Sequence, residues 1–218
     1  MESVAELVEA WTKGWVVSRG AAAPVAEPWG WTVDVGQVKQ VCRHVLPEPD
    51  EASVRKLVEA TTAPHTWLKL FADDETVRPW VGPGWEFDQP GFLMTVPLAP
   101  QEVAVPAGYT LTRWTTGGVL RVLVRTEAGH FAARGQIAPT GTTAVADQIE
   151  TSPEHRRRGL GGVVMRTLQS GAHAAGATTG VLVATPEGRA LYGSLGWTTH
   201  APMASLYFAP TDPASSAP

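Results

Sequence analysis

The chain has 218 residues, a hydrophobic fraction of 44%, a charged fraction of 17% and a formal net charge of −4. These values describe a globular protein with enough residues for one sizeable core or two small ones, and the acidic balance argues against a nucleic-acid partner. The single cysteine, Cys42, excludes an intrachain disulfide, and the sequence has no apolar run of the roughly 18 residues that a membrane helix needs.

Residues 1–98 are expected to form a first unit of alternating helices and strands. The chain start lacks the basic and apolar regions of a secretory signal, so we expect a cytoplasmic protein without membrane contact. A loop rich in Ala, Pro and Gly occupies 20–30, and three prolines within 97–107 mark the domain boundary. Apolar periodicity predicts helices at 3–17, 51–62 and 74–81, and strands at 31–35, 38–46, 66–72 and near 85–96.

Residues 99–210 are expected to form a second unit, followed by a disordered tail at 211–218. Gly117-Gly118 and Ala128-Gly129 are typical hairpin turns between strands. Together the two units predict an α/β protein with a mixed, largely antiparallel central sheet flanked by helices. The predicted strands are 109–114, 118–126, 130–138, 142–151, 179–184 and near 202–208, and the predicted helices are 160–174 and 186–194.

The two units share a weak internal repeat. At an offset of 112 residues, 60–90 and 172–202 match without a gap at nine of 31 positions, including Gly84-Trp85 against Gly196-Trp197. The predicted order of elements also coincides. An ancient duplication explains this match, and chance similarity in an alanine-rich chain is the alternative.

One segment of the second unit has the pattern of an anion-binding site. Residues 149–162 read IETSPEHRRRGLGG, which is the end of a strand, a short turn and a glycine-rich helix start. The first N–H groups of a helix lack intrahelical acceptors and lie at the positive end of its dipole. Glycines let a diphosphate approach the backbone closely, and the neighbouring arginines attract it. The segment lacks the Lys-Ser/Thr of a Walker loop and the third glycine of a dinucleotide fingerprint.

A second segment, LYGSLGW at 191–197, follows in the helix after the next strand. Together the two segments resemble the GNAT superfamily of acyl-CoA-dependent N-acyltransferases. The first is similar to its V-x-P-E-x-R-G-x-G-x-G loop, and the second is similar to its L-Y-x-x-L-G-F helix end, with Trp197 in the aromatic position. The resemblance covers about residues 109–208. It implies an acetyltransferase. Separately, the excess of arginine over lysine and the many Ala, Gly and Pro residues indicate a GC-rich bacterial genome.

The resemblance implies a binding mode for acetyl-CoA. The pantetheine arm would lie along Ile149, Glu150 and Thr151, with the Ile149 amide as the oxyanion donor. Thr185 replaces an Asn that often contacts the cofactor, although it is a good N-cap ahead of Pro186. The diphosphate would lie on the backbone amides of Arg156, Arg157, Arg158, Gly159, Leu160, Gly161 and Gly162.

The resemblance also implies direct attack of an amine on the thioester, without a covalent enzyme intermediate. Tyr192 matches the general acid that protonates the leaving thiolate. Strand alternation places Val145, Asp147 and Ile149 on one face, and Asp147 is the candidate base or ammonium-binding carboxylate. Glu150 is the alternative if a bulge changes the faces, and a water chain is a third possibility.

The expected function is acetylation of a small primary amine. The alternatives are a non-catalytic acyl-CoA- or metabolite-binding protein, and acetylation of aminoacyl-tRNA or a protein N-terminus. The six histidines show no metal-ligand spacing, so no metal is expected, and a homodimer is compatible with the sequence. The helix pair that covers the acceptor site in GNAT proteins has no room between the strands at 109–114 and 118–126. The N-terminal unit, a degenerate GNAT-like repeat or an extension, would replace it as a scaffold and substrate wall.

Overall fold

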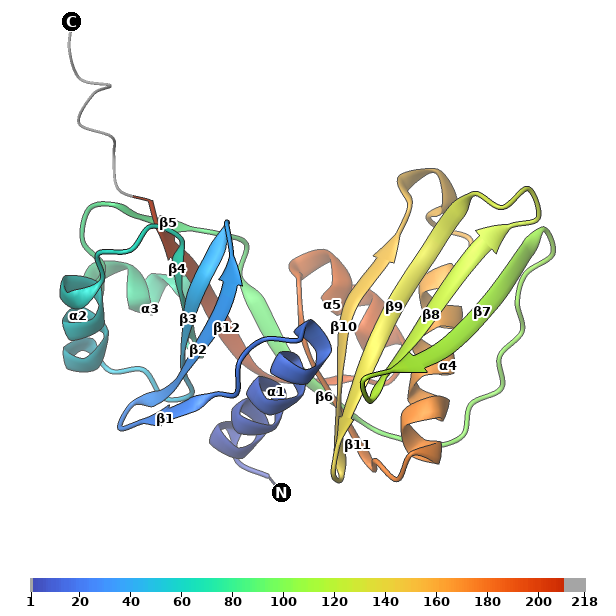
Figure 1. The fold of residues 1–218 in the computed structure, drawn as a ribbon, viewed down its shortest axis with the longest axis horizontal. Coiled ribbons are helices and arrows are strands. Elements are labelled where there is room, and N and C mark those ends of the chain that lie inside the picture. The colour runs from blue at the N-terminus through green and yellow to red at the C-terminus, as the bar shows by residue number, and fades with distance from the viewer. Residues whose placement is uncertain (1, 210–218) are drawn as a thin grey trace, which may run out of the picture.

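The computed structural model describes residues 2–209 and shows an elongated α/β molecule (Figure 1). Its N-terminal segment contains α1 (Val4–Arg19), β1 (Val25–Glu27), β2 (Gly30–Gln37), β3 (Gln40–Leu46), α2 (Glu51–Ala60), β4 (Thr66–Leu70), α3 (Asp74–Val77), the 3-10 helix η1 (Arg78–Trp80), β5 (Trp85–Phe87) and β6 (Gly91–Pro97). Its C-terminal segment contains β7 (Tyr109–Thr116), β8 (Val119–Thr126), β9 (Phe131–Thr140), β10 (Thr143–Thr151), η2 (Pro153–His155), α4 (Leu160–Ala174), β11 (Thr179–Ala184), α5 (Pro186–Ser194) and β12 (Thr198–Phe208).

Within the described residues the strands form one twelve-stranded sheet in the order β1-β2-β3-β4-β12-β6-β11-β10-β9-β8-β7, with β5 added beside β12. Only β3–β4 and β10–β11 pair in parallel. The other pairs are antiparallel, so the predicted mixed, largely antiparallel α/β fold is confirmed.

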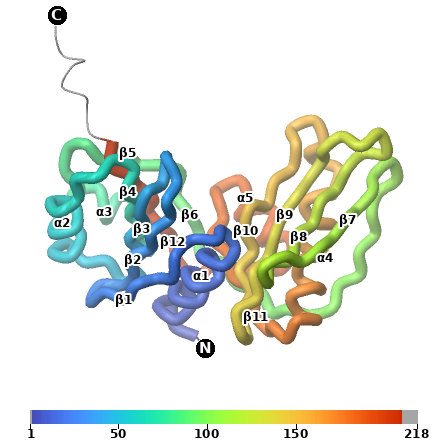
Figure 2. Tube along the Cα trace, viewed as in Figure 1, coloured from blue at the N-terminus to red at the C-terminus, as the bar shows by residue number. Residues whose placement is uncertain are grey.

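The two segments exchange strands at the centre of this sheet. Strand β6 comes from the N-terminal segment but pairs with β11 on one side and with the first part of β12 on the other. The last part of β12 pairs with β4 and β5 instead. Residues 98–108 then carry the chain from β6 to the outer edge strand β7 (Figure 2). The division at residue 98/99 therefore stays a prediction about two units whose strands are interleaved.

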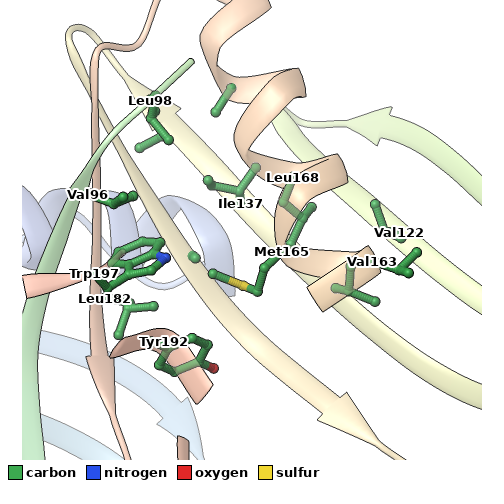
Figure 3. Packing of buried hydrophobic residues seen from close by; sticks show 14 of the residues in the cluster. Val96, Leu98, Val122, Ile137, Val163, Met165, Leu168, Leu182, Tyr192 and Trp197 are labelled. Atoms are coloured by element: carbon green, nitrogen blue, oxygen red, sulfur yellow. The ribbon is translucent and has the colours of Figure 1, made fainter. Parts of the chain in front are cut away.

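Three apolar clusters hold the layers together. Helix α4 packs on one face of β8, β9 and β10, where Met165 and Leu168 lie opposite Val122 and Ile137 (Figure 3). Helix α1 packs on the other face of β9 and β10, through a second cluster that includes Val145. The third cluster lies under α2 and the short helices of the N-terminal segment.

Helix α1 is defined by its caps as well as by its apolar face. Ser3 and Glu6 form a capping box, and Gly20 ends the helix in the left-handed conformation. Its face buries Trp11 and Trp15, together with Leu7 and Val8, against the sheet. The helix ends beside the middle of β10, which positions its last residues near the candidate site.

The sequence predicted the C-terminal elements to within a few residues; only β12 begins earlier than expected. The strand predicted near 85–96 is wrong as a single element. It is broken at Asp88–Pro90. Before the break, β5 pairs with the last part of β12; after the break, β6 pairs with β11. Strand β1 was missed, since all three of its residues are exposed and give no alternation.

The predicted disordered tail at 211–218 lies outside the described residues. None of the helices within residues 2–209 combines the length and the apolarity needed to cross a bilayer.

Candidate active site

Strands β10 and β11 start as a parallel pair and then separate. They are paired only from Thr143 to Val145, opposite Thr179 to Val181. Beyond this point β10 continues along β9 to Thr151, whereas β11 continues along β6 to Ala184. The edge of β10 after Val145 therefore has no partner strand on the β11 side within residues 2–209. An extended ligand with amide groups can pair with such an edge.

A bulge lies in β10 where the strands separate. The register with β9 shifts between Asp147 and Glu150, and Gln148 has a φ of 54°. The strict alternation predicted from the sequence is therefore wrong at Ile149, which packs with the α4 cluster. Asp147 contacts α1, and Glu150 bonds to Arg134, so the bulge places the two candidate carboxylates on the same face.

The start of α4 presents a row of free amides. Its N-cap Gly159 has a φ of 78° and provides no side-chain cap. No described residue accepts a hydrogen bond from the backbone N–H groups of Arg157 through Gly162. The Arg156 amide differs, since it donates to the Pro153 carbonyl at 3.4 Å. The predicted anion site is thus geometrically open over most of its length.

Side chains around these amides add positive charge and restrict the shape of the loop. Arg156 lies 3.5 Å from Glu187 of α5, and Arg158 donates to the Tyr109 hydroxyl at 3.2 Å. All three loop arginines are exposed. A Cβ atom at Gly161 would lie 2.9 Å from Leu191 Cδ2, so a side chain there would press against α5.

Tyr192 lies on α5 with only 8% of its surface exposed. Its ring packs near Trp197, with the ring centroids 6.0 Å apart, and its hydroxyl points away from Trp197 (Figure 3). Burial, with a smaller effect of the Asp147 charge, raises the pKa of Tyr192 to about 12. The phenol is therefore fully protonated at neutral pH. Thr185 caps α5 as predicted, accepting from the Gly188 amide at 3.1 Å.

Helix α1 supplies partners to Asp147 that the sequence did not reveal. Arg19 donates from Nε to Asp147 Oδ2 at 2.5 Å and from Nη2 to Oδ1 at 2.9 Å. Ser18 Oγ also donates to Oδ2, at 2.9 Å, and Gln136 Nε2 holds Ser18 through its carbonyl and hydroxyl oxygens, each at 2.7 Å. Asp147 is thus held in an ion pair with Arg19, to which the Ser18 hydroxyl adds a third hydrogen bond.

Comparisons with known proteins identify the fold. The family model described as "FR47-like protein" matches residues 121–205. A GCN5-related N-acetyltransferase from Kribbella flavida superposes with a TM-score of 0.68 at 21% identity, over 99% of each chain. A putative GNAT-family acetyltransferase from Novosphingobium aromaticivorans gives a TM-score of 0.60 at 19% identity, over 94% of this chain and 97% of that one.

This chain has the GNAT fold. A tandem GNAT protein from the clavulanic acid biosynthesis pathway is also similar, with a TM-score of 0.52 at 15% identity, over 74% of this chain and 69% of that one. No curated protein matches the sequence significantly. The GNAT resemblance read from the two motifs is therefore confirmed at the level of the fold, with an FR47-like domain in the C-terminal half.

Within the GNAT fold, an open pocket of about 570 Å³ lies on the α1 side of the C-terminal sheet. Gln148 and Glu150 reach it from the bulge of β10. Arg134 also lines it, and its Nε donates to Glu150 Oε2 at 2.8 Å. Its other lining residues come from β7, β8 and β9, and include Trp114, Arg121, Phe131 and Gln136.

The structure thus brings most of the predicted site residues to one region, around the separation of β10 and β11. The sequence missed Ser18, Arg19 and Gln136. Ser18 and Arg19 bond to Asp147 across more than a hundred residues, and Gln136 acts through its bonds to Ser18. The predicted absence of a helix pair between the first two strands of the C-terminal segment is correct, since a Gly117-Gly118 turn joins β7 to β8. Helix α1 lies over β9 and β10 instead.

Proposed function

We propose that this protein is an acetyl-CoA-dependent N-acetyltransferase that acts on a small primary amine. The observation that carries the proposal is the row of free amides from Arg157 to Gly162, next to the unpaired edge of β10. A diphosphate can take these N–H groups, and the amide groups of a pantetheine arm can pair with the strand edge.

The local residues fit such a ligand. Gly159 has a backbone conformation that favours glycine, and Gly161 leaves the backbone uncovered beside Leu191. The exposed side chains of Arg156, Arg157 and Arg158 in the same loop carry positive charge that complements a negative ligand. The Thr185 hydroxyl caps α5 by accepting from the Gly188 amide, so any contact with the cofactor would have to be made while this hydrogen bond is kept.

Acetyl-CoA supplies the thioester: a C–N bond forms between the acetyl carbon and the acceptor amine while the C–S bond breaks. The amine must lose a proton, and the departing sulfur must gain one. We assign the second proton to the Tyr192 phenol, because its raised pKa keeps it protonated at neutral pH. The Ile149 amide at the bulge is our candidate for the oxyanion donor.

Two carboxylates compete for the first proton. Asp147 is closed off by Arg19, whereas Glu150 is half-exposed and lies in the pocket, paired with Arg134. The geometry favours Glu150, directly or through a water, as the group that accepts the proton from the amine. Asp147 then has an electrostatic role, since its charge acts on Tyr192.

A second candidate function is binding of acyl-CoA without turnover. The observation that favours it is the Arg19–Asp147 ion pair, which with the Ser18 hydroxyl takes three of the roughly four acceptor positions of this candidate base. The two functions differ in thiol release and not in cofactor binding.

One experiment separates them. Thermal-shift titration with acetyl-, propionyl- and longer acyl-CoAs measures binding, and thiol release over an amine panel measures transfer. We expect acetyl-CoA to raise the unfolding temperature and a subset of amines to release CoA thiol. Binding without thiol release for any amine would favour the binding protein, and the absence of any shift would refute both functions.

A further inference from the structure

A row of side chains crosses the C-terminal sheet on its α1 face. The strand registers pair Trp114 with Arg121, Arg121 with Gln136, and Gln136 with Asp147. Residues opposite each other on neighbouring strands share a face of the sheet. The row therefore runs from the outer strand β7, through the pocket, to the bulge of β10, where transfer is proposed to occur.

The arginines in and beside this row differ in whether they have a carboxylate partner. Arg134 is paired with Glu150, and Arg19 is paired with Asp147. Arg121 has no carboxylate partner among residues 2–209; its Nη1 donates only to the carbonyls of Thr116 and Val119, at 3.1 and 3.4 Å. These two bonds hold the guanidinium at the β7–β8 turn and leave its Nε and Nη2 donors available. The pocket therefore contains one fixed cation that lacks a counter-charge.

The outer part of the pocket is apolar. Trp114 and Phe131 both line it, and they are exposed to 42% and 39%. Aromatic rings at the rim of a pocket of about 570 Å³ provide a flat surface for the carbon skeleton of a ligand.

We propose that the acceptor is a primary amine that also carries a carboxylate, with an apolar spacer between the two groups. The carboxylate binds Arg121 and the amine reaches Glu150 at the bulge, so the spacer crosses β9 between them, with Trp114 and Phe131 as apolar walls of the same pocket. Glu150 is aligned through Arg134 with Leu123, two residues along β8 from Arg121. Two inter-strand spacings across the sheet (about 9.5 Å) and two residues along it (about 6.6 Å) separate the two positions by roughly 11–12 Å. This distance selects an ω-amino acid or an aromatic amino acid of similar length over a short zwitterion. The inference rests on the proposed function, because it names the acceptor for the same site.

Matched pairs of amines test the carboxylate directly in the unmodified protein. The probes are ε-aminocaproate against hexylamine, and para-(aminomethyl)benzoate against benzylamine, each with acetyl-CoA and thiol release as the readout. A charge-assisted hydrogen bond to arginine changes binding about tenfold or more. We therefore expect kcat/KM to be at least about tenfold higher for the carboxylate member of each pair.

The variants Arg121→Gln and Arg113→Gln locate the effect. Arg113 is on the same hairpin but is paired with Val122, a core residue under α4, so it lies on the opposite face of the sheet. Its substitution by glutamine removes the same charge as Arg121→Gln. Arg121→Gln should raise KM for the carboxylate amines about tenfold, with little change in kcat or in KM for the neutral amines. Arg113→Gln should leave the preference intact, and Arg121→Lys should keep part of it if the glutamine variant fails to fold.

The outcomes distinguish the two proposals. If acetyl-CoA binds but kcat/KM is no higher for the carboxylate member of each pair, the acceptor assignment is wrong and the cofactor site stands. The same conclusion follows if acetyl-CoA binds and neither member is acetylated. If acetyl-CoA does not bind, the proposed function fails. In that case a thermal shift by the carboxylate amines that Arg121→Gln abolishes would still support the Arg121 site, and no shift would reject it.

Discussion

The two parallel strand pairs of this protein begin alike and end differently. In the N-terminal segment, β3 and β4 stay paired over five positions, from Cys42–Thr66 to Leu46–Leu70. In the C-terminal segment, β10 and β11 separate after three positions. Each pair is joined by a helix, α2 or α4. The first arrangement closes the sheet, and the second leaves an edge on which a ligand can lie.

The starts of α2 and α4 differ in the same way: the first is closed by a cap and the second is open to a ligand. Asp50 caps α2, and its carboxylate accepts from the Ser53 amide at 3.0 Å. The start of α4 has Gly159 in the corresponding place, with free amides behind it. At a helix start capped by a carboxylate, an N–H donor is already taken and a negative charge is already present, so a phosphate is not favoured there. The comparison shows that the candidate site is defined by hydrogen-bonding groups that the protein leaves unused.

The strand exchange supports our hypothesis of an ancient duplication. At the 112-residue offset, β4 corresponds to β11, β5 to the first part of β12, and β6 to its last part. The pairing is reciprocal: β6 pairs with β11 and the first part of β12, whereas the last part of β12 pairs with β4 and β5. Superposition of the two half-chains tests the duplication: half-chains that superpose would support it, and half-chains that do not would count against it.

The largest effect is expected from Gly161→Glu, which should abolish binding of CoA. The new side chain would press on Leu191, 2.9 Å from the ideal Cβ position, and would place a negative charge among the free amides. Isothermal titration with acetyl-CoA checks this. The matched control is Ala52→Glu at the exposed start of α2, which should leave the affinity unchanged. Unchanged affinity in Gly161→Glu would refute the assignment of the loop.

Tyr192→Phe should slow turnover by about 10²- to 10⁴-fold with little loss of CoA affinity, because it removes only the proton donor. The raised pKa of about 12 also fixes the pH dependence. The acid form is complete below that value, so Tyr192 should cause no fall in kcat between pH 6 and roughly 10. Rate measurements over this range check both points, and wild-type rates in the variant would remove the acid role.

Arg19→Ala should destabilise the fold by about 1–3 kcal/mol, because it leaves the mostly buried Asp147 carboxylate without its main partner. Urea unfolding measures this. Lys13→Ala is the control on the same helix, since its pair with Glu9 is exposed and should contribute at most about 0.5 kcal/mol. Equal effects of the two variants would show that the Asp147 contact is no more than a surface pair.

The smallest effect is expected from Asp50→Ala, which removes the cap of α2. Hydrogen bonds from Ser53 lower the pKa of Asp50, so the cap stabilises the fold above the carboxyl's unfolded pKa and loses this contribution as the pH falls through the lowered value. The variant should therefore have a slightly lower unfolding temperature at pH 7 than the parent. This difference should shrink in acid below roughly pH 4. A difference that grows in acid would contradict the role of the carboxylate.

Local patterns predicted much of this structure. The Gly117-Gly118 turn has positive φ at both residues, and α4 and α5 begin and end at the predicted residues. Such features depend on neighbours in the sequence. The free amides of the loop follow from the same local pattern, since glycines cannot cap a helix with a side chain.

Non-local contacts could not be predicted in this way. Arg19 and Asp147 are 128 residues apart, and neither has a neighbour that signals the pair. The exchange of β6 and β12 depends on which edges meet in the folded sheet. The bulge at Gln148 was anticipated only as an alternative, because a non-glycine residue with positive φ has no clear sequence signature.

The most direct test of the central claim is to follow the backbone amide resonances of residues 156–162 while CoA or pantetheine is added. Pantetheine lacks the diphosphate but keeps the arm that would lie along β10. We predict that CoA shifts the amides from Arg157 to Gly162, and that pantetheine shifts only those near Ile149–Thr151. Loop amides that do not respond to CoA, or that respond equally to pantetheine, would contradict a diphosphate site at the start of α4.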